Sequence, residues 1–143
     1  MKILIAGSTG LLGTHLVKIL TLHGYDVIGL SKTGGGEFAV DLRDQTESNR
    51  ILSKHNPDVV INLVALTSVE KCEVFPQLSF ELNCKVAEIL TEWCVTNNKR
   101  QVYISTDHIY DGLDPSKEIE VKILNNYALA KYAGELASQK GRT

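Results

Sequence analysis

The sequence predicts a doubly wound α/β fold, in which helices cover both faces of a parallel sheet. Short β-rich runs alternate with longer segments of helical periodicity along the chain. Several of these runs are continuously apolar, as Val59, Val60 and Ile61 are, which is typical of strands that are buried on both faces. A glycine-rich turn follows the first run directly and leads into the first helical segment, as at the start of a βαβ unit.

Five segments are expected to form the strands of the sheet. They are residues 2–6, 25–30, 37–40, 58–63 and 101–105. The first segment begins with Lys2 and so resembles the start of a signal peptide. Its apolar run ends at Gly7, however, and no cleavage site follows a longer apolar core. We therefore expect a buried first strand.

Four helices are expected between or after these strands. Apolar residues of the first helix share one face, namely Leu12, Leu16, Ile19 and Leu20. This helix ends near Gly24, which suits a left-handed cap. The other helices are residues 45–55, a long helix that begins at Pro76, and a last helix from about Asn125 toward Gln139. Right-handed crossovers between the strands then give the doubly wound arrangement.

Composition narrows the possible functions. The 143 residues are 43% hydrophobic and 22% charged, with a formal net charge of −2. We therefore expect one domain spanning residues 1–143 and no electrostatic attachment to nucleic acid or anionic lipid. No run approaches the roughly 18 apolar residues of a membrane span. The three cysteines lack metal-ligand spacing, so we expect reduced thiols, no metal site and a cytoplasmic protein.

The turn at residues 7–13 has the glycine spacing of a phosphate-binding loop. Gly7 permits a tight turn, Gly10 lets the backbone approach a pyrophosphate, and Gly13 allows the helix to pack close to the strand. The helix N-terminus offers free N–H groups and a partial positive charge to phosphate. A purely structural turn is the alternative. The position between a strand and an amphipathic helix favours binding of NAD or NADP.

The end of the second strand bears on the choice between NAD and NADP. An acidic residue there would accept hydrogen bonds from the adenosine ribose and favour NAD. The sequence instead has Ser31, Lys32 and Thr33, which can meet a 2′-phosphate, so NADP is slightly favoured. The alternative is that the lysine is merely solvated. Asp41 and Leu42 stand where an adenine can be contacted, although Asp41 could instead cap the next helix.

A second group of polar residues lies in the C-terminal third. Ser105, Thr106 and Asp107 follow the fifth strand, at the carboxyl edge where doubly wound sheets bind ligands. Tyr127 and Lys131 stand four residues apart on one face of the last helix. A nearby ammonium favours the ionised form of a phenol. The pair therefore suits proton donation to a carbonyl that is being reduced, with Thr106 hydrogen-bonded to the same oxygen and Lys131 able to hold the nicotinamide ribose. Such a pair is structural in many proteins, but its combination with the glycine turn favours a catalytic role.

These motifs resemble those of the extended short-chain dehydrogenases/reductases, and within them the dTDP-4-dehydrorhamnose reductase (RmlD-like) group. The resemblance runs over essentially the whole chain. Its most specific segment is Ser105-Thr106-Asp107-His108-Ile109-Tyr110-Asp111-Gly112. The other landmarks are residues 7–13, 56–62 and 65–73, Asn83, and residues 126–135.

The resemblance implies an NAD(P)H-dependent reduction of the 4-keto group of a sugar nucleotide, as in dTDP-rhamnose biosynthesis. Tyr127 would be the proton donor, Lys131 its electrostatic partner and ribose ligand, and Thr106 and Asp107 would meet the substrate. The cofactor contacts expected from the motifs and the resemblance together are Gly7, Thr9, Gly10, Leu11, Leu12, Gly13, Ser31, Lys32, Asp41, Leu42, Val64, Ala65, Leu66, Thr67, Tyr127 and Lys131.

Four positions depart from the pattern of that family. His108 and Tyr110 stand where Tyr and Phe are usual, and Ala128 and Ala130 stand where Gly and Ser or Thr are usual. None of these changes removes a catalytic group. They leave open which sugar nucleotide is the substrate.

In that family the chain continues beyond the helix that carries Tyr127 and Lys131. Further strands complete the sheet, and a smaller domain closes over the sugar nucleotide. Residues 1–143 would therefore hold the dinucleotide-binding part and lack most of the substrate-binding part. The fifth strand, residues 101–105, would remain as an apolar edge of the sheet, so we expect a partner chain or a second copy to cover it.

Two alternative functions stay open. One is a sugar-nucleotide epimerase or dehydratase on the same fold. The other is a non-catalytic dinucleotide-binding protein, similar to the regulatory subunit of methionine adenosyltransferase. The segment at residues 105–112 favours a reductase, because the dehydratases of this superfamily have a motif resembling Thr-Asp-Glu there. The expected lack of a substrate-binding part makes the regulatory alternative more credible.

Overall fold

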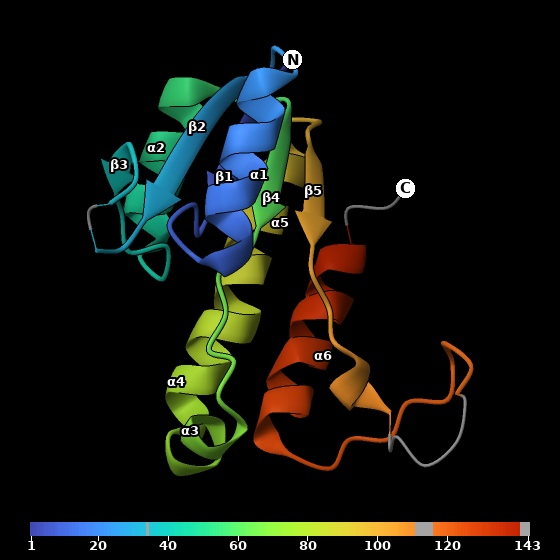
Figure 1. Cartoon of the computed structure of the whole chain (residues 1–143). Coiled ribbons are helices and arrows are strands. Elements are labelled where there is room, and N and C mark those ends of the chain that lie inside the picture. Colours follow the sequence, from blue (N-terminus) through green and yellow to red (C-terminus); the bar gives the residue numbers. More distant parts are fainter. Residues whose placement is uncertain (34, 111–115, 141–143) are drawn as a thin grey trace.

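The computed structural model describes residues 1–33, 35–110 and 116–140 and contains a five-stranded parallel sheet (Figure 1). The strands are β1 (Lys2–Ala6), β2 (Asp26–Ser31), β3 (Phe38–Ala39), β4 (Val59–Asn62) and β5 (Arg100–Tyr103). The helices are α1 (Leu11–Leu22), α2 (Gln45–His55), α3 (Val69–Val74), α4 (Pro76–Phe80), the π-helical turn η1 (Glu81–Lys85), α5 (Val86–Thr96), the 3₁₀ turn η2 (Asp107–Ile109) and α6 (Asn126–Gln139).

The strands lie in the order β3-β2-β1-β4-β5, and every neighbouring pair is parallel. The chain first moves outward from β1 to β3 and then returns to the other side of β1 at β4. Ligands of doubly wound sheets bind at such a reversal, outside the carboxyl ends of the strands. The predicted doubly wound α/β fold is confirmed, and the reversal of strand order lies at β1 and β4.

Helices cover both faces of the sheet. Helix α1 packs against β1 and β2 on one face, whereas α2 and α5 lie on the opposite face (Figure 1). The apolar core fills the space between the sheet and α2 and α5. Its members include Leu4, Leu30, Leu52, Val60, Leu90 and Trp93. Helix α6 packs beside α5 and η1, and both α4 and the first half of α6 extend past the ends of the strands (Figure 1).

The long third helix begins at Pro76 as predicted, but it is not uniform. The π-helical turn η1 interrupts it between α4 and α5. A separate short helix, α3, precedes it and begins at Ser68, whose side chain accepts from the N–H of Lys71 at 3.2 Å. The sequence did not predict α3, because six residues are too short to show a helical period.

Four strands have other limits than the sequence predicts; β4, for example, is one residue shorter at each end than the predicted 58–63. Strand β5 ends at Tyr103 and not at Ser105, because its neighbour β4 ends at Asn62, the partner of Tyr103. Strand β2 runs one residue later at each end than expected, in register with β1. Strand β3 is only two residues long, since it pairs with the last two residues of β2 alone. Gly34 lies outside the described residues.

The cysteines Cys72, Cys84 and Cys94 are buried and form no disulfide among the described residues. Burial raises the pKa of the Cys94 thiol to about 12 and also raises the pKa of Cys84, so both stay protonated at neutral pH. No helix in the described ranges is both long and apolar enough to cross a membrane.

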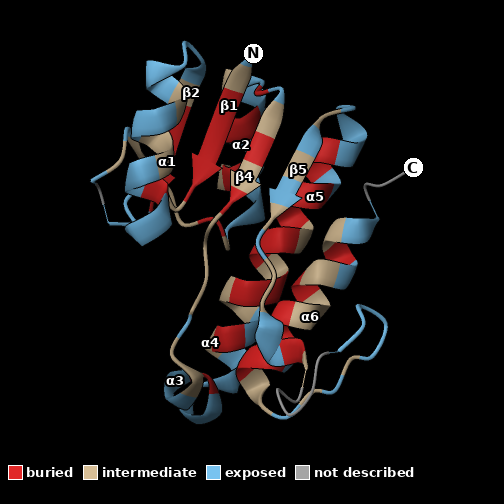
Figure 2. Ribbon diagram, turned by 45° about the vertical axis from the view of Figure 1, so that its right-hand side comes forward, coloured by how far each residue is buried: buried red, intermediate tan, exposed pale blue. Residues whose placement is uncertain are grey.

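Strand β5 forms one edge of the sheet, as predicted. Part of β5 is exposed (Figure 2). Val102 is 43% exposed, and Ile104, just beyond the strand, is 42% exposed. In the central strand β1, by contrast, every residue from Ile3 to Ala6 is buried. An open strand edge with apolar side chains is a template for pairing with another chain.

We expect Gly13→Ala to destabilise the protein. A Cβ at residue 13 would overlap the carbonyl oxygen of Gly7 and lie 2.8 Å from backbone atoms of Ser8. Helix α1 would have to move away from β1, at a cost of about 2–4 kcal/mol, against a gain of about 1 kcal/mol from the helix propensity of alanine. Urea unfolding should show a lower midpoint for Gly13→Ala. The control Lys18→Ala, at an exposed position of the same helix, should change the free energy of unfolding by less than about 0.5 kcal/mol. An unchanged midpoint for Gly13→Ala would contradict the close packing of α1 on β1.

Coverage of the β5 edge by a partner chain or a second copy stays a prediction. Sedimentation velocity at micromolar concentration should show a species heavier than the 15.8 kDa chain. Val102→Lys should restore the monomer, since a lysine on an edge strand opposes pairing. A stable monomer whose β5 amides exchange freely with solvent would rule the idea out.

Candidate functional site

The glycine turn between β1 and α1 leaves backbone N–H groups open at the ligand-binding edge. Gly7 has a φ of +85°, and the N–H groups of Gly7 and Ser8 both donate to the carbonyl of Leu30 at 2.9 Å. The first α-helical bond of α1 runs from Thr14 to the carbonyl of Gly10, so the N–H groups before Thr14 have no acceptor within the helix. Leu11 is 89% exposed, which leaves this rim of the turn accessible to a phosphate.

A cavity next to this turn collects several of the predicted cofactor contacts. Those among its lining residues are Gly7, Ser31, Lys32, Asp41, Leu42 and Val64. Its remaining walls are apolar and come from Leu30, Val40, Leu82 and Val86, which the sequence did not single out for this role. A slot with apolar walls and a charged end suits an adenosine group.

Asp41 does not cap the following helix. The cap of α2 is Asp44, whose carboxylate accepts from the N–H of Glu47 at 3.0 Å. The carboxylate of Asp41 instead accepts from Arg43, with Nε–Oδ1 and Nη2–Oδ2 distances of 3.0 and 2.6 Å, and pairs with Lys32 at 3.1 Å. The hydrogen bonds from Arg43 hold the pKa of Asp41 well below its usual range, so this carboxylate is ionised.

The loop after β4 holds the predicted contacts Val64, Ala65, Leu66 and Thr67, and a buried asparagine fixes it. The Oδ1 atom of Asn83, in η1, accepts from the N–H of Leu66 at 2.9 Å, and its Nδ2 donates to the carbonyl of Leu66 at 3.0 Å. Asn83 is fully buried. The sequence pointed to Asn83 only as a landmark, because its partner lies 17 residues away.

Asn62 lies at the carboxyl end of β4 beside this loop. Its Oδ1 accepts from the N–H of Val64 at 3.1 Å. Its Nδ2 is buried and has no hydrogen-bond partner within residues 1–33, 35–110 and 116–140. An unpaired buried donor costs free energy unless a further group satisfies it. Together with the open N–H groups of the glycine turn, this donor fits a polar ligand such as a dinucleotide at the ends of β1 and β4.

Tyr103 connects this loop to α6. Its hydroxyl donates to the carbonyl of Asn83 at 2.9 Å and lies 3.1 Å from the carbonyl of Lys131. Burial raises the pKa of Tyr103, so the hydroxyl keeps its proton. A Cβ at Gly134 would overlap the carbonyl oxygen of Asn83 and lie 2.5 Å from the Tyr103 hydroxyl. The close contact between α6 and η1 therefore requires glycine at this position.

Lys131 is buried, with only 4% of the residue exposed. Its ammonium donates to the carbonyl of Ile104 and lies 4.3 Å from the centre of the Tyr103 ring. Burial lowers the pKa of Lys131 to about 8, and the charge of Glu135 opposes this shift. Glu135 in turn accepts from the hydroxyl of Ser105 at 2.5 Å. The lysine is thus held between the end of β5 and α6, and neutral pH lies just below its pKa.

Tyr127 lies in the first turn of α6 and is buried. Its ring packs edge-on against His108, with 5.4 Å between the ring centres. The helix start is fixed by Asn125, whose side chain accepts from the N–H of Ala128 at 2.7 Å. Two further bonds join Asn126 to the carboxylate of Glu73 in α3, at 2.7 and 2.8 Å.

Thr106 caps η2, where its hydroxyl accepts from the N–H of His108 at 3.2 Å. Thr106 and Asp107 both line a groove along the outer edge of β5, together with Tyr110 and Glu135. The structure thus places two of the predicted catalytic residues, Tyr127 and Lys131, in the first half of α6, and the third, Thr106, at the start of η2. Asp111 and Gly112 of the same motif lie outside the described residues.

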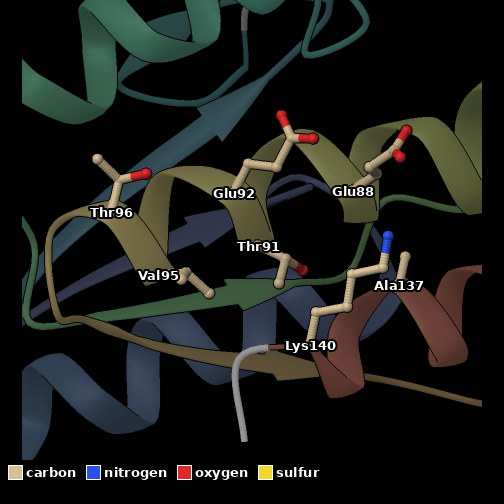
Figure 3. A pocket seen from close by; sticks show the side chains of 7 residues that line it. All are labelled: Glu88, Thr91, Glu92, Val95, Thr96, Ala137 and Lys140. Atoms are coloured by element: carbon tan, nitrogen blue, oxygen red, sulfur yellow. The ribbon is translucent and has the colours of Figure 1, made fainter. Parts of the chain in front are cut away.

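The predicted residues therefore form three neighbouring groups at one edge of the sheet. Thr9 to Gly13 form the rim of the glycine turn, the cavity lined by Asp41 and Leu42 lies beside it, and the loop after β4 leads to the group on η2 and α6. The contacts of Asn83 and Tyr103 connect the last two groups. A separate pocket between α5 and the end of α6 contains none of the predicted residues (Figure 3). It is lined by Glu88, Thr91, Glu92, Val95, Thr96, Ala137 and Lys140.

Comparisons with known proteins identify a family and several similar proteins. The model of the family described as RmlD substrate binding domain matches residues 1–142. The dTDP-4-dehydrorhamnose reductase of Aggregatibacter actinomycetemcomitans is 30% identical over 138 residues, which are 94% of this chain and 45% of that protein.

Two solved structures are similar over nearly the whole chain. One is a dTDP-4-dehydrorhamnose reductase from Clostridium acetobutylicum, with a TM-score of 0.89 and 29% identity, covering 98% of this chain and 49% of that one. The other is the dTDP-4-dehydrorhamnose reductase from Bacillus anthracis in complex with NADP, with a TM-score of 0.88 and 25% identity, covering 97% and 49%. The chain spans about half the length of the relatives it matches.

We expect Lys131→Met to stabilise the folded chain at neutral pH. Above pH 10.5 Lys131 is neutral in both the folded and the unfolded chain. Between about pH 8 and pH 10.5 the unfolded chain carries the proton on this lysine, whereas the folded chain does not. Protonation therefore favours unfolding, and the full penalty of about 3 kcal/mol is present below pH 8. Methionine removes this penalty and loses one hydrogen bond of about 1 kcal/mol.

Thermal or urea unfolding at pH 7 and pH 10.5 measures this effect. A gain of about 2 kcal/mol at pH 7 should disappear at pH 10.5. The control Lys140→Met, at an exposed lysine near the end of α6, should have an effect below about 0.5 kcal/mol at both values. Destabilisation by Lys131→Met at pH 7 would contradict the burial of a charged lysine.

Proposed function

This chain belongs to the RmlD substrate-binding-domain family, and we propose that residues 1–143 form the NAD(P)-binding domain of a sugar-nucleotide reductase of the dTDP-4-dehydrorhamnose reductase type. The observation that carries the proposal is the connection of two groups at one sheet edge. The loop beside the glycine turn is hydrogen-bonded to Asn83, and Asn83 is joined through Tyr103 to Lys131. A dinucleotide bound at the turn would thus extend toward Lys131 and Tyr127.

Residues of this chain have separate roles in holding the cofactor. The N–H groups at the start of α1 would bind the pyrophosphate. Asp41 and Leu42 would lie at the adenosine, the loop at residues 64–67 would pass along the cofactor, and Tyr127 and Lys131 would hold the nicotinamide ribose. The NADP in the similar structure from Bacillus anthracis supports a nicotinamide dinucleotide as the ligand.

The reduction requires a hydride and a proton, and the chain supplies the proton. When bound, the reduced nicotinamide supplies the hydride. The hydroxyl of Tyr127 would donate its proton to the 4-keto oxygen, and the hydroxyl of Thr106 would hydrogen-bond the same oxygen. A charged Lys131 near the tyrosine would stabilise the phenolate left behind. The hydrogen bond from Lys131 to the carbonyl of Ile104 would help to hold the ammonium in place.

The proposal also includes a place for the substrate and a way to separate the alternative functions. The sugar nucleotide would approach along the groove that Thr106 and Asp107 line beside β5. An epimerase or dehydratase would use the same dinucleotide without net consumption of NADPH. A regulatory protein would bind the dinucleotide without turnover. Titration and turnover therefore separate the three functions.

We expect calorimetric titration to show binding of NADPH or NADH, and a dTDP-4-keto-6-deoxy sugar to be reduced with consumption of the cofactor. Tyr127→Phe should lower turnover by about 10²–10⁴-fold because the proton donor is lost, while the dissociation constant of the cofactor stays within about twofold. Tyr132→Phe, in the same helix, is the control and should retain both properties.

Each contrary outcome has a distinct meaning. Unchanged turnover in Tyr127→Phe would remove Tyr127 from the mechanism. Tight binding without turnover would support either the regulatory function or a cofactor-binding part that needs a further substrate-binding part for turnover. The absence of binding to either dinucleotide would contradict the proposed function as a whole.

A further inference from the structure

The chain between β5 and η2 lies beyond the paired part of the sheet. Strand β5 ends at Tyr103, whose partner Asn62 is the last residue of β4, and η2 begins at Asp107. Residues 104–106 therefore belong to neither a strand nor a helix, and they run beside α6 (Figure 1). The last of them is Thr106, the proposed hydrogen-bond donor to the keto oxygen. The position of Thr106 thus depends on the contacts that hold this short segment.

Two side chains of α6, one helical turn apart, hold the segment. The ammonium of Lys131 donates to the carbonyl of Ile104. The carboxylate of Glu135 accepts from the hydroxyl of the next residue, Ser105, at 2.5 Å. Residues four apart lie on the same face of a helix, which is why both side chains reach the same place. Because an ionised acceptor makes a stronger hydrogen bond than a neutral one, the contact with Ser105 is suited to fixing the backbone.

Glu135 also provides a negative charge near the buried ammonium. Burial lowers the pKa of Lys131 to about 8, and the charge of Glu135 acts against this shift. The elements around this part of α6, and α6 itself, carry further ionisable groups, namely Tyr103 of β5, Cys84 of η1, Glu88 of α5, Glu73 of α3, Asp107 and His108 of η2, and Tyr127. Among the described residues, Glu135 is the one whose charge acts on the pKa of Lys131.

We propose that Glu135 is a positioning residue of the site, which holds the segment of Thr106 against α6 through Ser105 and keeps the ammonium of Lys131 charged. The inference rests on the proposed function, because it gives Glu135 a part in proton donation. A charged Lys131 is what would stabilise the phenolate left by Tyr127. Glu135 would act through Lys131 and Ser105 and not on the reacting atoms.

The charge of Lys131 can be measured in the full chain without turnover, from ¹H–¹³C spectra of ¹³C-labelled lysine across a pH titration. Lys131→Met identifies the signal by its loss, and the wild-type midpoint should lie at about pH 8. Glu135→Gln keeps an oxygen that can accept from Ser105 and removes the negative charge. The midpoint of Lys131 should therefore fall by about one pH unit. A residue that only held the backbone would leave this midpoint unchanged.

Ser105→Ala tests the contact that holds the segment, because it removes the hydroxyl and keeps the charge of Glu135. The ¹⁵N order parameters of residues 104–106 should fall from about 0.85 to below about 0.7 in this variant, and should stay above about 0.8 in Glu135→Gln. Two controls should change neither quantity. Glu92→Gln removes an exposed glutamate of α5, and Ser138→Ala removes a hydroxyl that donates to the carbonyl of Gly134 within α6, at 2.8 Å. Circular dichroism establishes that each variant is folded.

The outcomes separate this inference from the proposed function. A fall of the Lys131 midpoint in Glu135→Gln, together with a loosened segment in Ser105→Ala, would support the inference. A midpoint that stays within about 0.3 pH units, or order parameters that do not change in Ser105→Ala, would overturn it even if the chain binds NADPH. The absence of NADPH binding would contradict the proposed function, and with it the part of Glu135 in proton donation, even if Lys131 titrates as expected.

Discussion

The site depends on the buried side chain of Asn83 in the π-helical turn. Its amide group makes two hydrogen bonds to the backbone of Leu66, at 2.9 and 3.0 Å, and a third to Ser79 at 3.3 Å. A fully buried amide is costly unless its donors and acceptors are satisfied, so these bonds hold one geometry strongly. The backbone carbonyl of Asn83 accepts from Tyr103 and so fixes α6 as well. One residue thus positions the loop beside the proposed cofactor and the helix of the proposed proton donor. Such π-helical turns are common at functional sites.

The same region contains a buried charge that lowers the stability of the fold. Lys131 is buried beside the aromatic ring of Tyr103, and its pKa falls to about 8 because the ammonium loses water contacts. Glu135, bonded to Ser105, limits this fall. At the other end of the site, Asp41 is bound by two cations that a phosphate could use. At Lys131 a charge is kept where an apolar residue would pack at lower cost, which is typical of functional sites. The proposed chemistry accounts for this cost.

Local sequence patterns were sufficient for the elements and for the first βαβ unit. The continuous apolar run of β4, the glycines at positions 7 and 13, and Pro76 each report on their own neighbourhood, and the structure confirms the elements they predict. Long-range contacts were not predictable. The Arg43–Glu81 pair spans 38 residues, and the end of β5 is decided by the length of β4. The alternative that Asp41 caps α2 was wrong because Asp44 stands one turn closer to the helix. The spacing of Tyr127 and Lys131 in α6 could be predicted from the sequence. The burial of Lys131 against Tyr103 could not, since it depends on the packing of α6 against β5 and η1.

Membership of the RmlD substrate-binding-domain family and the sheet order support a dinucleotide at the ends of β1 and β4, and the contacts of Asn83 connect that place to α6. The most direct test is a titration of the ¹⁵N-labelled chain with NADPH, followed by ¹H–¹⁵N correlation spectra. The account predicts that amide signals shift together in three segments that are distant in sequence, residues 7–13, 64–67 and 127–131. Shifts confined to one of these segments, or the absence of shifts in all three, would contradict it.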